Sequence, residues 1–395
     1  MVSIRNFSGP NNDMRFCVVG AGFSGAIIAR HLSEKGHKVL LIDERPHIAG
    51  NCHTERDSST GVMLHQYGPH IFHTADQRAW DYVRRFGNFR PYINRVKAIS
   101  QGRIYTLPVN LLTINQFFNT TLSPSEARAF IEKKADKSIK EPQNFEEQAL
   151  SMIGPELYKA FFYGYTRKQW GLEPSELPAS ILKRLPLRFN YDDNYFNHPY
   201  QGMPEDGYTA IVENIIKSDN IELRLNTSFE QVSEKFRHTF YTGPIDRYFD
   251  FRIGRLGYRT LDFKRIESEG DFQGTAVINY CDQDVPFTRI SEHKHFAPWE
   301  ADTLPRTVCF REYSRLAGPE DVPYYPIRLV NEKTMLDSYI KLARETSGVS
   351  FLGRLGTYRY LDMDVTISEA LVACDQVDAL LAVGESLPPF FIDPS

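Results

Sequence analysis

The sequence predicts an α/β fold built on a Rossmann-like domain, which the chain leaves to form a helical lobe and an antiparallel β-sheet lobe before it returns. Three observations predict this fold. A glycine-rich turn near the N-terminus lies between a buried strand and a helix, residues 124–165 have a helical pattern, and residues 260–313 have a strand pattern. A final strand, turn and helix bring the chain back to the first domain.

The first predicted element is a βαβ unit. Residues 16–19 form an apolar run typical of a buried strand, and the motif Gly-x-Gly-x-x-Gly at residues 20–25 follows directly. A helix is expected through residues 26–35, ended by Gly36, and residues 38–42 predict a second buried strand. The glycines permit a tight turn and let backbone N–H groups approach a pyrophosphate at the helix N-terminus. The unit therefore predicts a dinucleotide site.

Helices are expected next. Ser123 with Pro124, and later Asn144, are predicted helix starts, because Ser and Asn side chains cap a first turn and proline suits it. Gly154 is a predicted stop. Together these signals predict a lobe made mostly of helices.

Strands return afterwards, at residues 261–263, 276–280 and 287–294, and residues 367–381 predict a closing helix. Seven segments result: 14–85, 203–250 and 336–395 for the Rossmann-like domain, 86–104 and 251–335 for the sheet lobe, 105–185 for the mostly helical lobe, and 186–202 for a mobile loop that enters the sheet lobe.

Composition and charge exclude several classes of function. The formal net charge is −4, so no general attraction to nucleic acid or anionic membranes is expected. The sequence carries neither a signal peptide nor an apolar run long enough to span a bilayer, which favours a cytoplasmic location. The five scattered cysteines lack the spacing of a zinc or disulfide site, so no metal is expected. The polar residues 1–13 are interpreted as a disordered extension.

The stretch after the second strand favours FAD over NAD. Residues 43–51 run from an acid into small residues that let the backbone pass close to a cofactor, and this pattern resembles the glutathione-reductase-type FAD fold. Asp43 is placed to accept ribose hydroxyls. Residues 353–356, which precede 358–364, resemble the second flavin contact of those proteins, where the end of a strand leads into a helix that faces the flavin.

Further motifs resemble the UDP-galactopyranose mutase family, and they follow one another in the family's order from about residue 14 to the closing helix. Such a series is far more specific than the glycine motif alone. The motifs are YGPHIFHT at 67–74, YGYTRKQWG at 163–171, LKRLP at 182–186, DNYF at 193–196, YTGPID at 241–246, TRISEHKHF at 288–296, GRL at 353–355 and YLDM at 360–363.

The resemblance implies a homodimeric, cytoplasmic isomerase that interconverts UDP-galactopyranose and UDP-galactofuranose and so supplies galactofuranose for cell-surface glycans. The implied cofactor is FAD, active when reduced and kept reduced by NAD(P)H or a reductase. In the implied reaction, N5 of the reduced flavin attacks the anomeric carbon, UDP leaves, and the sugar recloses through a flavin-iminium adduct without net redox change. Nucleic acid and membrane are not implied partners.

Family position also assigns the catalytic candidates. Arg184 and Arg289 match the arginines that bind the diphosphate, and Arg184 lies on the loop that closes the site. A departing UDP is anionic, and a guanidinium donates paired hydrogen bonds to such groups. His73, in a loop expected to pass near the flavin ring, is the third candidate. No strong general base stands out elsewhere in the sequence.

Aromatic residues match the remaining substrate positions. Phe161 and Tyr165, four apart on one face of the predicted helix, are expected to sandwich the uracil, with Phe162 beside them. Core packing is the alternative for Phe162 and for Trp170, which matches a mobile-loop tryptophan. Other predicted substrate-binding residues are Asn94, Tyr195, Asn279, Tyr324 or its neighbour Tyr325, and Tyr360, while Arg259 has a weaker match. Predicted cofactor-binding residues are Gly20, Gly22, Phe23, Ser24, Gly25, Asp43, Glu44, Arg45, Gly50, Asn51, His70, Ile71, Arg354, Tyr360, Asp362 and Met363.

One departure from the family pattern and two alternatives complete the interpretation. Ala49 stands where the family commonly has glycine, and its methyl group is expected to be tolerated if its φ is negative. An FAD oxidoreductase of the amine-oxidase or desaturase kind explains residues 20–43 equally well, but not the two arginines or the aromatic slot. A non-catalytic nucleotide-sugar or flavin-binding module is the second alternative. Acceptance of the 2-acetamido sugar stays open, and residues 382–395 match no functional motif.

Overall fold

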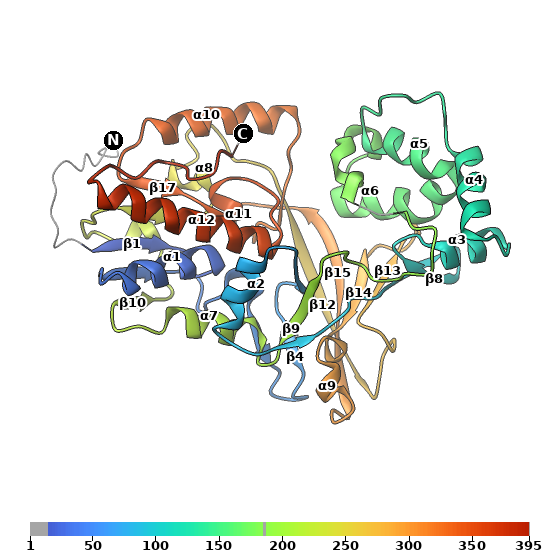
Figure 1. Ribbon diagram of the computed structural model, residues 1–395, viewed down its shortest axis with the longest axis horizontal. Helices are drawn as coiled ribbons and strands as arrows, with labels where there is room; N and C mark the ends of the chain where they lie inside the picture. Colours follow the sequence, from blue (N-terminus) through green and yellow to red (C-terminus); the bar gives the residue numbers. More distant parts are fainter. Residues whose placement is uncertain (1–14, 185–186, 395) are drawn as a thin grey trace.

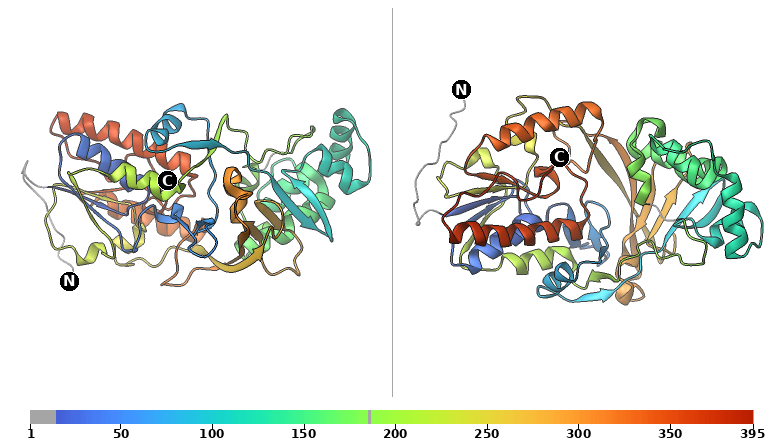
Figure 2. Two further views of the ribbon diagram at one scale, coloured as in Figure 1. Left: turned by 90° about the horizontal axis from the view of Figure 1, so that it is seen from below. Right: turned by 45° about the horizontal axis from the view of Figure 1, so that its top comes forward.

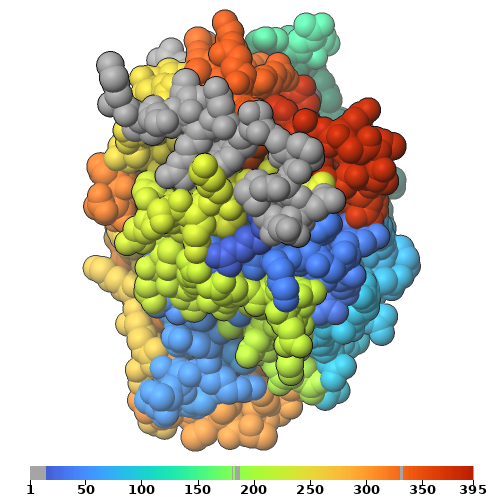
Figure 3. Space-filling view, turned by 90° about the vertical axis from the view of Figure 1, so that its left-hand side faces the viewer, coloured from blue at the N-terminus to red at the C-terminus, as the bar shows by residue number. Residues whose placement is uncertain are grey.

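A five-stranded parallel sheet forms the centre of the first domain in the computed structural model, which describes residues 15–184 and 187–394. The strand order is β10-β2-β1-β11-β17, with bounds Ile221–Arg224, Val39–Ile42, Phe16–Val19, Thr239–Tyr241 and Val349–Phe351. The two predicted strands are confirmed as β1 and β2, which pair in parallel. Segments from the start, middle and end of the chain gather in this domain (Figures 1 and 3). The predicted leader, residues 1–13, lies outside the described residues.

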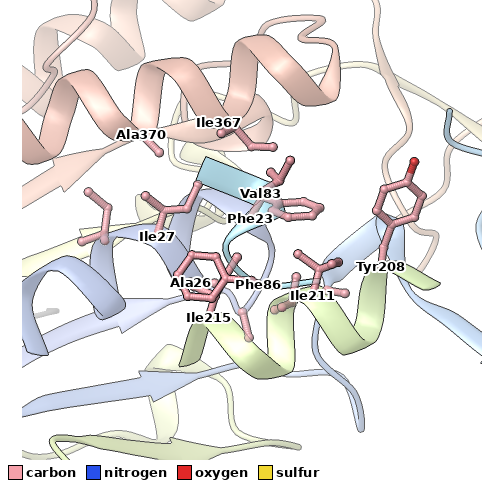
Figure 4. Close-up of a cluster of buried hydrophobic side chains, with 14 of the residues drawn as sticks. Phe23, Ala26, Ile27, Val83, Phe86, Tyr208, Ile211, Ile215, Ile367 and Ala370 are labelled. Atoms are coloured by element: carbon pink, nitrogen blue, oxygen red, sulfur yellow. The ribbon is translucent and has the colours of Figure 1, made fainter. Parts of the chain in front are cut away.

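Helices cover both faces of the parallel sheet (Figure 2). Alternate residues of β1 separate two cores, because Phe16 and Val18 pack on one side and Cys17 on the other. The first core contains side chains of α1 (Phe23–Glu34), α2 (Gln77–Arg84), α7 (Gly207–Ile216) and α12 (Met363–Ala382), as Figure 4 shows. The opposite face carries α8 (Ile245–Tyr248) and α10 (Val330–Arg344).

Two helix predictions need small corrections. The first helix begins at Phe23, three residues before the predicted start, because the glycine turn leads straight into helical geometry with Gly22 as its N-cap. The helix ends at Glu34, and Gly36 follows with a φ of +84°, which confirms the predicted stop. The predicted closing helix is confirmed as α12, which also begins earlier, at Met363.

A seven-stranded sheet forms the second body, to the right of the first domain in Figure 1. Its order is β16-β12-β15-β14-β13-β7-β8, with bounds Tyr325–Pro326, Tyr258–Glu269, Arg306–Leu316, Arg289–Glu292, Val277–Tyr280, Val96–Ser100 and Arg103–Leu107. Neighbouring strands are antiparallel, as predicted, except that β13 and β7 run parallel. Strands β7 and β8 precede the helical lobe in sequence, whereas β13 follows it. The pairing of β7 with β13 therefore joins the two parts of the sheet that the helical lobe separates in sequence.

The helical lobe packs on the far end of this sheet (Figure 1). Ser123 forms a capping box with Glu126, and the Asn144 side chain accepts from the Glu147 backbone, so both predicted helix starts are confirmed. The lobe contains α3 (Leu111–Phe118), α4 (Pro124–Lys134), α5 (Phe145–Leu157), η2 (Tyr158–Tyr163) and α6 (Gly164–Trp170). Among the helices of the described residues, none combines the length and the apolar character needed to cross a membrane.

Short elements complete the described chain. A three-stranded sheet has the order β5-β9-β6 and joins segments far apart in sequence. The short elements are β3 (Thr54–Arg56), β4 (Met63–His65), β5 (Phe72–Thr74), β6 (Phe89–Pro91), β9 (Tyr200–Pro204), α9 (Pro298–Ala301), α11 (Gly353–Gly356), η1 (Gly50–Cys52), η3 (Pro174–Glu176), η4 (Ala179–Arg184), η5 (Phe229–Gln231) and η6 (His293–Phe296).

The segment η2 is a π-helix, which differs from the predicted regular α-helix through residue 165. The predicted stop at Gly154 is confirmed, because its φ of +76° and ψ of +170° are not helical and separate the two helical stretches that make up α5. A π-helical segment has a wider turn than an α-helix and is frequent at functional sites. Phe161 lies within this segment, whereas Tyr165 lies beyond it, in α6.

Ala49 has a φ of +72°, so the negative φ on which tolerance of its methyl group depended is not present. The reason is local, because Ala49 is the N-cap of η1 and its backbone turns through the left-handed region before Gly50. In this region the Cβ of an L-residue crowds the following carbonyl oxygen at a cost of roughly 1–2 kcal/mol. Its N–H donates to the Ala21 carbonyl at 2.8 Å, which ties the loop to the glycine turn.

We therefore expect Ala49→Gly to increase the free energy of unfolding by about 0.5–1 kcal/mol, since relief of strain exceeds the added chain entropy of glycine. Ala29→Gly, in the middle of α1, is the matched control and is expected to lower it by at least about 1 kcal/mol. Urea unfolding of both variants under one set of conditions checks the pair. A loss of stability in Ala49→Gly equal to that of the control would contradict the strain at this position.

Candidate functional site

A long cleft runs along the carboxyl ends of β1, β11 and β17, where ligands of open parallel sheets usually bind. We call it the dinucleotide cleft. The predicted cofactor-binding residues that line it are Gly20, Gly22, Phe23, Ser24, Asp43, Glu44, Arg45, Gly50, Asn51, His70, Arg354 and Met363.

Two glycine positions keep this cleft open for a ligand. Gly20 has a φ of +99°, and a Cβ there would lie 2.0 Å from the Thr242 hydroxyl oxygen. Gly22 and Gly50 face each other, because a Cβ on Gly50 would lie 3.4 Å from the Gly22 Cα. Only backbone occupies this part of the wall, so N–H groups at the start of α1 can reach a phosphate group. The third glycine of the motif, Gly25, lies against the Gly20 carbonyl and lines neither cleft.

The carboxylate of Asp43 has a structural task that the sequence did not indicate. Its Oδ2 accepts from the Ala21 N–H at 2.8 Å and its Oδ1 from the Arg45 N–H at 2.9 Å. Burial raises the pKa of Asp43, while these two hydrogen bonds oppose the rise. Glu44 lines the same cleft and forms an ion pair with Arg247. Two adjacent acids therefore face the end of the cleft where a ribose is expected.

Arg45 provides a test of whether a phosphorylated ligand fits. Its Nη1 is buried and has no hydrogen-bond partner in the structure. Its guanidinium lies 4.6 Å from the centre of the Tyr67 ring, so the cation is held over an aromatic face. An unpartnered buried donor is costly unless a ligand satisfies it. The residues present therefore fit an anionic group such as a pyrophosphate.

A second cleft adjoins the first, and we call it the aromatic cleft. It is lined by residues of the parallel-sheet domain, the seven-stranded sheet and the helical lobe. The predicted site residues that line it are Ile71, His73, Asn94, Tyr165, Tyr195, Asn279, Arg289, Tyr324, Tyr325, Tyr360 and Asp362. Asn51, His70, Arg354, Leu361 and Met363 line both clefts, and we call them the shared wall.

Arg289 is the cation of the aromatic cleft, and Glu312 on the neighbouring strand β15 holds it. The Arg289 Nε donates to Glu312 Oε2 at 2.8 Å; Arg289 exposes 24% of its side chain and Glu312 only 2%. Burial alone would lower the pKa of Arg289, but the Glu312 carboxylate more than offsets this effect, so the pKa is raised. Because Nε is engaged, the two Nη groups remain to bind an anion in the cleft.

Tyrosines surround this arginine. Burial raises the pKa of Tyr165, Tyr195 and Tyr325 above the ordinary value of 10.0, so each carries its hydroxyl hydrogen at neutral pH. Tyr325 interacts with Arg289 and stacks on Tyr360 at 5.7 Å between ring centres. Tyr324 instead lies near Tyr67, at 6.4 Å, on the side of Arg45. Both tyrosines line the cleft, and Tyr325 is the one beside the arginine.

Asn94 offers a further polar group to a ligand. Its side chain is 4% exposed, and Oδ1 has no hydrogen-bond partner in the structure. Its backbone carbonyl accepts from the Tyr195 N–H at 2.9 Å, which holds the segment that carries this tyrosine. Asn279, on β13, lines the same cleft. Since buried polar atoms normally have partners, the Asn94 carbonyl oxygen points to a ligand with hydroxyl groups.

The shared wall is neutral at its histidine and cationic at its arginine. Nδ1 of His70 lies 2.9 Å from the Gly68 carbonyl oxygen, and burial lowers the pKa of His70 to about 4. Arg354 donates to the carbonyl oxygens of Pro323 and Tyr324, which fixes the strand start that carries Tyr325. The wall between the clefts is therefore rigid and holds one fixed positive charge at neutral pH.

The predicted uracil slot is only half present in the aromatic cleft. Tyr165 lines it, whereas Phe161 is 3% exposed and packs in the helical lobe at 5.0 Å from Tyr105, measured between ring centres. Phe162 packs against the same core. The separation follows from packing, because Tyr105 and Phe117 hold the Phe161 ring in the core of the lobe, while Tyr165 lines the cleft. Trp170 also packs against this core and lies 6.3 Å from Tyr325.

Two predicted arginines lie apart from this geometry. Arg184 is the last residue of η4, and its side chain lies outside the described residues. Arg259 donates to the Gln169 carbonyl oxygen at 3.1 Å and to the Ser314 hydroxyl at 3.2 Å, so it anchors the end of α6 to the sheet.

Some site residues were not predicted from the sequence. Tyr67 and Thr242 lie inside motifs that were recognised, but no role was assigned to them. Phe229, Tyr241 and Arg247 line the far end of the dinucleotide cleft, where they suit a flat base and its ribose. Glu312 carries no sequence signal at all, because its partner Arg289 lies on another strand and only the sheet register joins them.

Comparisons with known proteins agree with this geometry. A family model described as UDP-galactopyranose mutase matches residues 160–360, and one described as an NAD(P)-binding Rossmann-like domain matches residues 18–86. The chain is 56% identical to a probable UDP-galactopyranose mutase of Klebsiella pneumoniae, over 96% of this chain and 99% of that protein. It is 52% identical to a dTDP-fucopyranose mutase of Escherichia coli, over 91% and 97% respectively.

Solved structures show a similar fold. A crystal structure of reduced UDP-galactopyranose mutase has a TM-score of 0.72 at 16% sequence identity, and the match covers 93% of this chain and 96% of that chain. A putative protoporphyrinogen oxidase from Exiguobacterium has a TM-score of 0.62 at 12% identity, over 94% and 100%. At such identities the likeness concerns the fold alone.

The neutral His70 predicts a pH dependence of stability. Its folded pKa of about 4 lies below the ordinary histidine pKa of 6.5, so between these pH values only the unfolded chain binds the proton. The free energy of unfolding therefore falls as pH falls from 6.5 to 4, by about 1.4 kcal/mol per pH unit for one such group. We expect His70→Gln to reduce this slope by that amount in urea unfolding between pH 6.5 and 4. Equal slopes for the variant and the unaltered protein would contradict the assignment.

Proposed function

The chain belongs to the UDP-galactopyranose mutase family, and we propose that it interconverts UDP-galactopyranose and UDP-galactofuranose with reduced FAD and no net redox change. The observation that carries this proposal is the shared wall. A dinucleotide in its cleft would meet a sugar nucleotide in the aromatic cleft at His70, Arg354 and Met363. Cofactor and substrate would thus be in contact without a protein nucleophile or base between them.

Reduced FAD would be held along the dinucleotide cleft. The start of α1 and the orphaned donor of Arg45 suit its pyrophosphate, and Asp43 and Glu44 suit its ribose. When bound, reduced FAD supplies the N5 nucleophile for the anomeric carbon of the sugar. Asn51, Arg354 and Met363 in the shared wall would hold the flavin end, close to Asp362 and Tyr360.

The residues of the aromatic cleft would bind and orient the sugar nucleotide. Arg289 carries a fixed positive charge that Glu312 maintains, and it would receive the negative charge of the departing UDP. Tyr195 and Tyr325, which burial keeps neutral, and Tyr360 would donate hydroxyl hydrogen bonds to the phosphate oxygens. Asn94 and Asn279 would contact the sugar or a phosphate. Arg184, by its family position, would complete the diphosphate site from the closing loop.

Tyr165 would stack on the uracil, with Phe161, Phe162 and Trp170 as further family positions that need a shift of the helical lobe to reach the ligand. Closure of the segment near Trp170 and Tyr195 would exclude water and protect the activated sugar from hydrolysis.

The cellular context of this proposal follows from the resemblance and the residues. All five cysteines are free, which suits a reducing cytoplasm and a reduced flavin. We propose a homodimer, NAD(P)H or a reductase as electron donor, and a role in supplying galactofuranose for cell-surface glycans.

One observation favours a second candidate substrate. The relative described as dTDP-fucopyranose mutase is 52% identical, close to the 56% of the probable UDP-galactopyranose mutase. The two substrates differ in the methyl group on the nucleotide base, in the 2′-hydroxyl of the nucleotide ribose and in the sugar hydroxyl at C6. dTDP-fucofuranose is therefore the competing substrate in any assay.

The proposed function predicts turnover that depends on reduction. Purified protein with bound flavin is incubated with UDP-galactofuranose or dTDP-fucofuranose, with and without dithionite, and the products are separated by HPLC. We expect UDP-galactopyranose to form in the reduced samples alone. Turnover that consumes an electron acceptor would favour the oxidoreductase alternative, and preferential conversion of dTDP-fucofuranose would favour the second candidate.

Glu312→Gln removes the negative charge behind Arg289 and keeps the side-chain shape. We expect kcat/KM of the reduced enzyme to fall roughly 10- to 100-fold, and roughly 1,000-fold for Arg289→Ala, with flavin retained in both variants. Glu369→Gln is the matched control, because Glu369 pairs with Arg359 and lines neither cleft. Activity in Glu312→Gln equal to that of the control would show that Arg289 does not need its carboxylate.

A further inference from the structure

His73 is held from outside the aromatic cleft by a second histidine. Its Nδ1 lies 2.7 Å from Nδ1 of His198, and the two rings are 4.9 Å apart. The Phe196 ring stacks on His73 at 3.6 Å with an angle of 22° between the planes. His73 is thus held on one face by an aromatic ring and at one nitrogen by an imidazole, and its side chain also lines the aromatic cleft.

The distance between the two Nδ1 atoms has a simple chemical meaning. A hydrogen bond between them needs one hydrogen, so one ring donates and the other accepts. If both Nδ1 atoms carried hydrogens, two donors would face each other and the contact would be lost. The charges that act on His73 are the carboxylates of Asp362 and Asp364, at the start of α12, and the His198 ring itself. Burial lowers the pKa of His73, which favours a neutral ring and therefore an intact pair.

The His73–His198 pair lies close to the start of strand β9. Residues 187–199 precede β9, and β9 pairs with β5 so that Gln201 lies opposite His73. The same segment carries Tyr195, which lines the aromatic cleft, and it is folded around the buried Arg188, which donates to the carbonyl oxygens of Asp192 and Asn194. The Gln201 side chain donates to the His198 carbonyl oxygen at 2.8 Å. This hydrogen bond holds the backbone of His198 in place independently of the contact with His73.

We propose that His198 is a positioning residue for catalysis: its Nδ1 fixes the ring orientation and the tautomer of His73, so that Nε2 of His73 is directed to the ligands at the shared wall. This inference rests on the proposed function for its effect on turnover, and on geometry alone for the hydrogen bond. His198 lines neither cleft, so it acts on the ligands through His73. The same contact links the position of His73 to that of the segment that carries Tyr195.

A matched pair of substitutions tests the contact atom. An asparagine amide lies where Nδ1 of histidine lies, whereas a glutamine amide reaches the place of Nε2. His198→Asn therefore keeps the bond to His73, and His198→Gln and His198→Ala lose it. In reduced enzyme with UDP-galactofuranose, we expect kcat to fall about tenfold in His198→Ala and His198→Gln, as for one lost hydrogen bond, with KM and flavin content unchanged. His198→Asn is expected to stay within about threefold of the unaltered enzyme.

A second measurement needs no substrate. The nitrogen chemical shifts of ¹⁵N-histidine-labelled holoenzyme report which ring nitrogen carries hydrogen, and the His73 signals are assigned by their loss in His73→Asn. We expect these signals to shift in His198→Gln and to be retained in His198→Asn. Identical His73 signals and identical kcat in the Asn and Gln variants would overturn the proposal. If the signals differ as expected while the unaltered enzyme turns over no substrate, the proposed function fails and the hydrogen bond stands.

Discussion

The structure depends on keeping one cation charged in a cleft from which water is partly excluded. Removing a guanidinium from water is unfavourable unless a carboxylate and hydrogen bonds compensate for the lost hydration. Glu312 provides this compensation for Arg289, and the register of β14 with β15 places the two residues opposite each other. The rest of the aromatic cleft is built around the pair: the helical lobe contributes Tyr165, the parallel-sheet domain contributes Tyr360, and the seven-stranded sheet contributes Asn279. Three parts of the fold therefore converge on one ion pair.

Local features of the fold were predictable from the sequence because their causes are local. The strand–glycine–helix unit, the caps at Ser123 and Asn144, and the stop at Gly36 each follow from residues within one turn of the feature. The start of α1 was displaced by three residues because a glycine turn requires no capping side chain. The left-handed backbone at Ala49 escaped prediction, since nothing in its side chain indicates it. Glu312, His198 and the parallel pairing of β7 with β13 depend on contacts between distant segments, which a sequence pattern does not contain.

The two clefts differ in how they handle charge. The dinucleotide cleft combines backbone N–H groups at the start of α1 with the buried donor of Arg45 and with Arg354 in the shared wall. The aromatic cleft has a paired arginine and several hydroxyl groups that burial keeps neutral. Such a cleft can bind an anion without adding another full charge that would remain uncompensated when the anion leaves. This division suits chemistry in which a diphosphate departs and returns.

The π-helix from Tyr158 to Tyr163 has a consequence for the evolution and engineering of this lobe. A segment of this kind contains one residue more than the α-helix of equal rise, and its wide turn takes up the extra residue so that the helix beyond it keeps its facing. A single deletion within the segment would therefore restore an α-helix and leave Tyr165, Lys168 and Trp170 near their present positions. A deletion within α6 has no such turn to take it up and would rotate every later side chain by about 100°. Chimeras that exchange this lobe with a relative therefore tolerate a difference of one residue in length within this segment, but not in the helix that follows it.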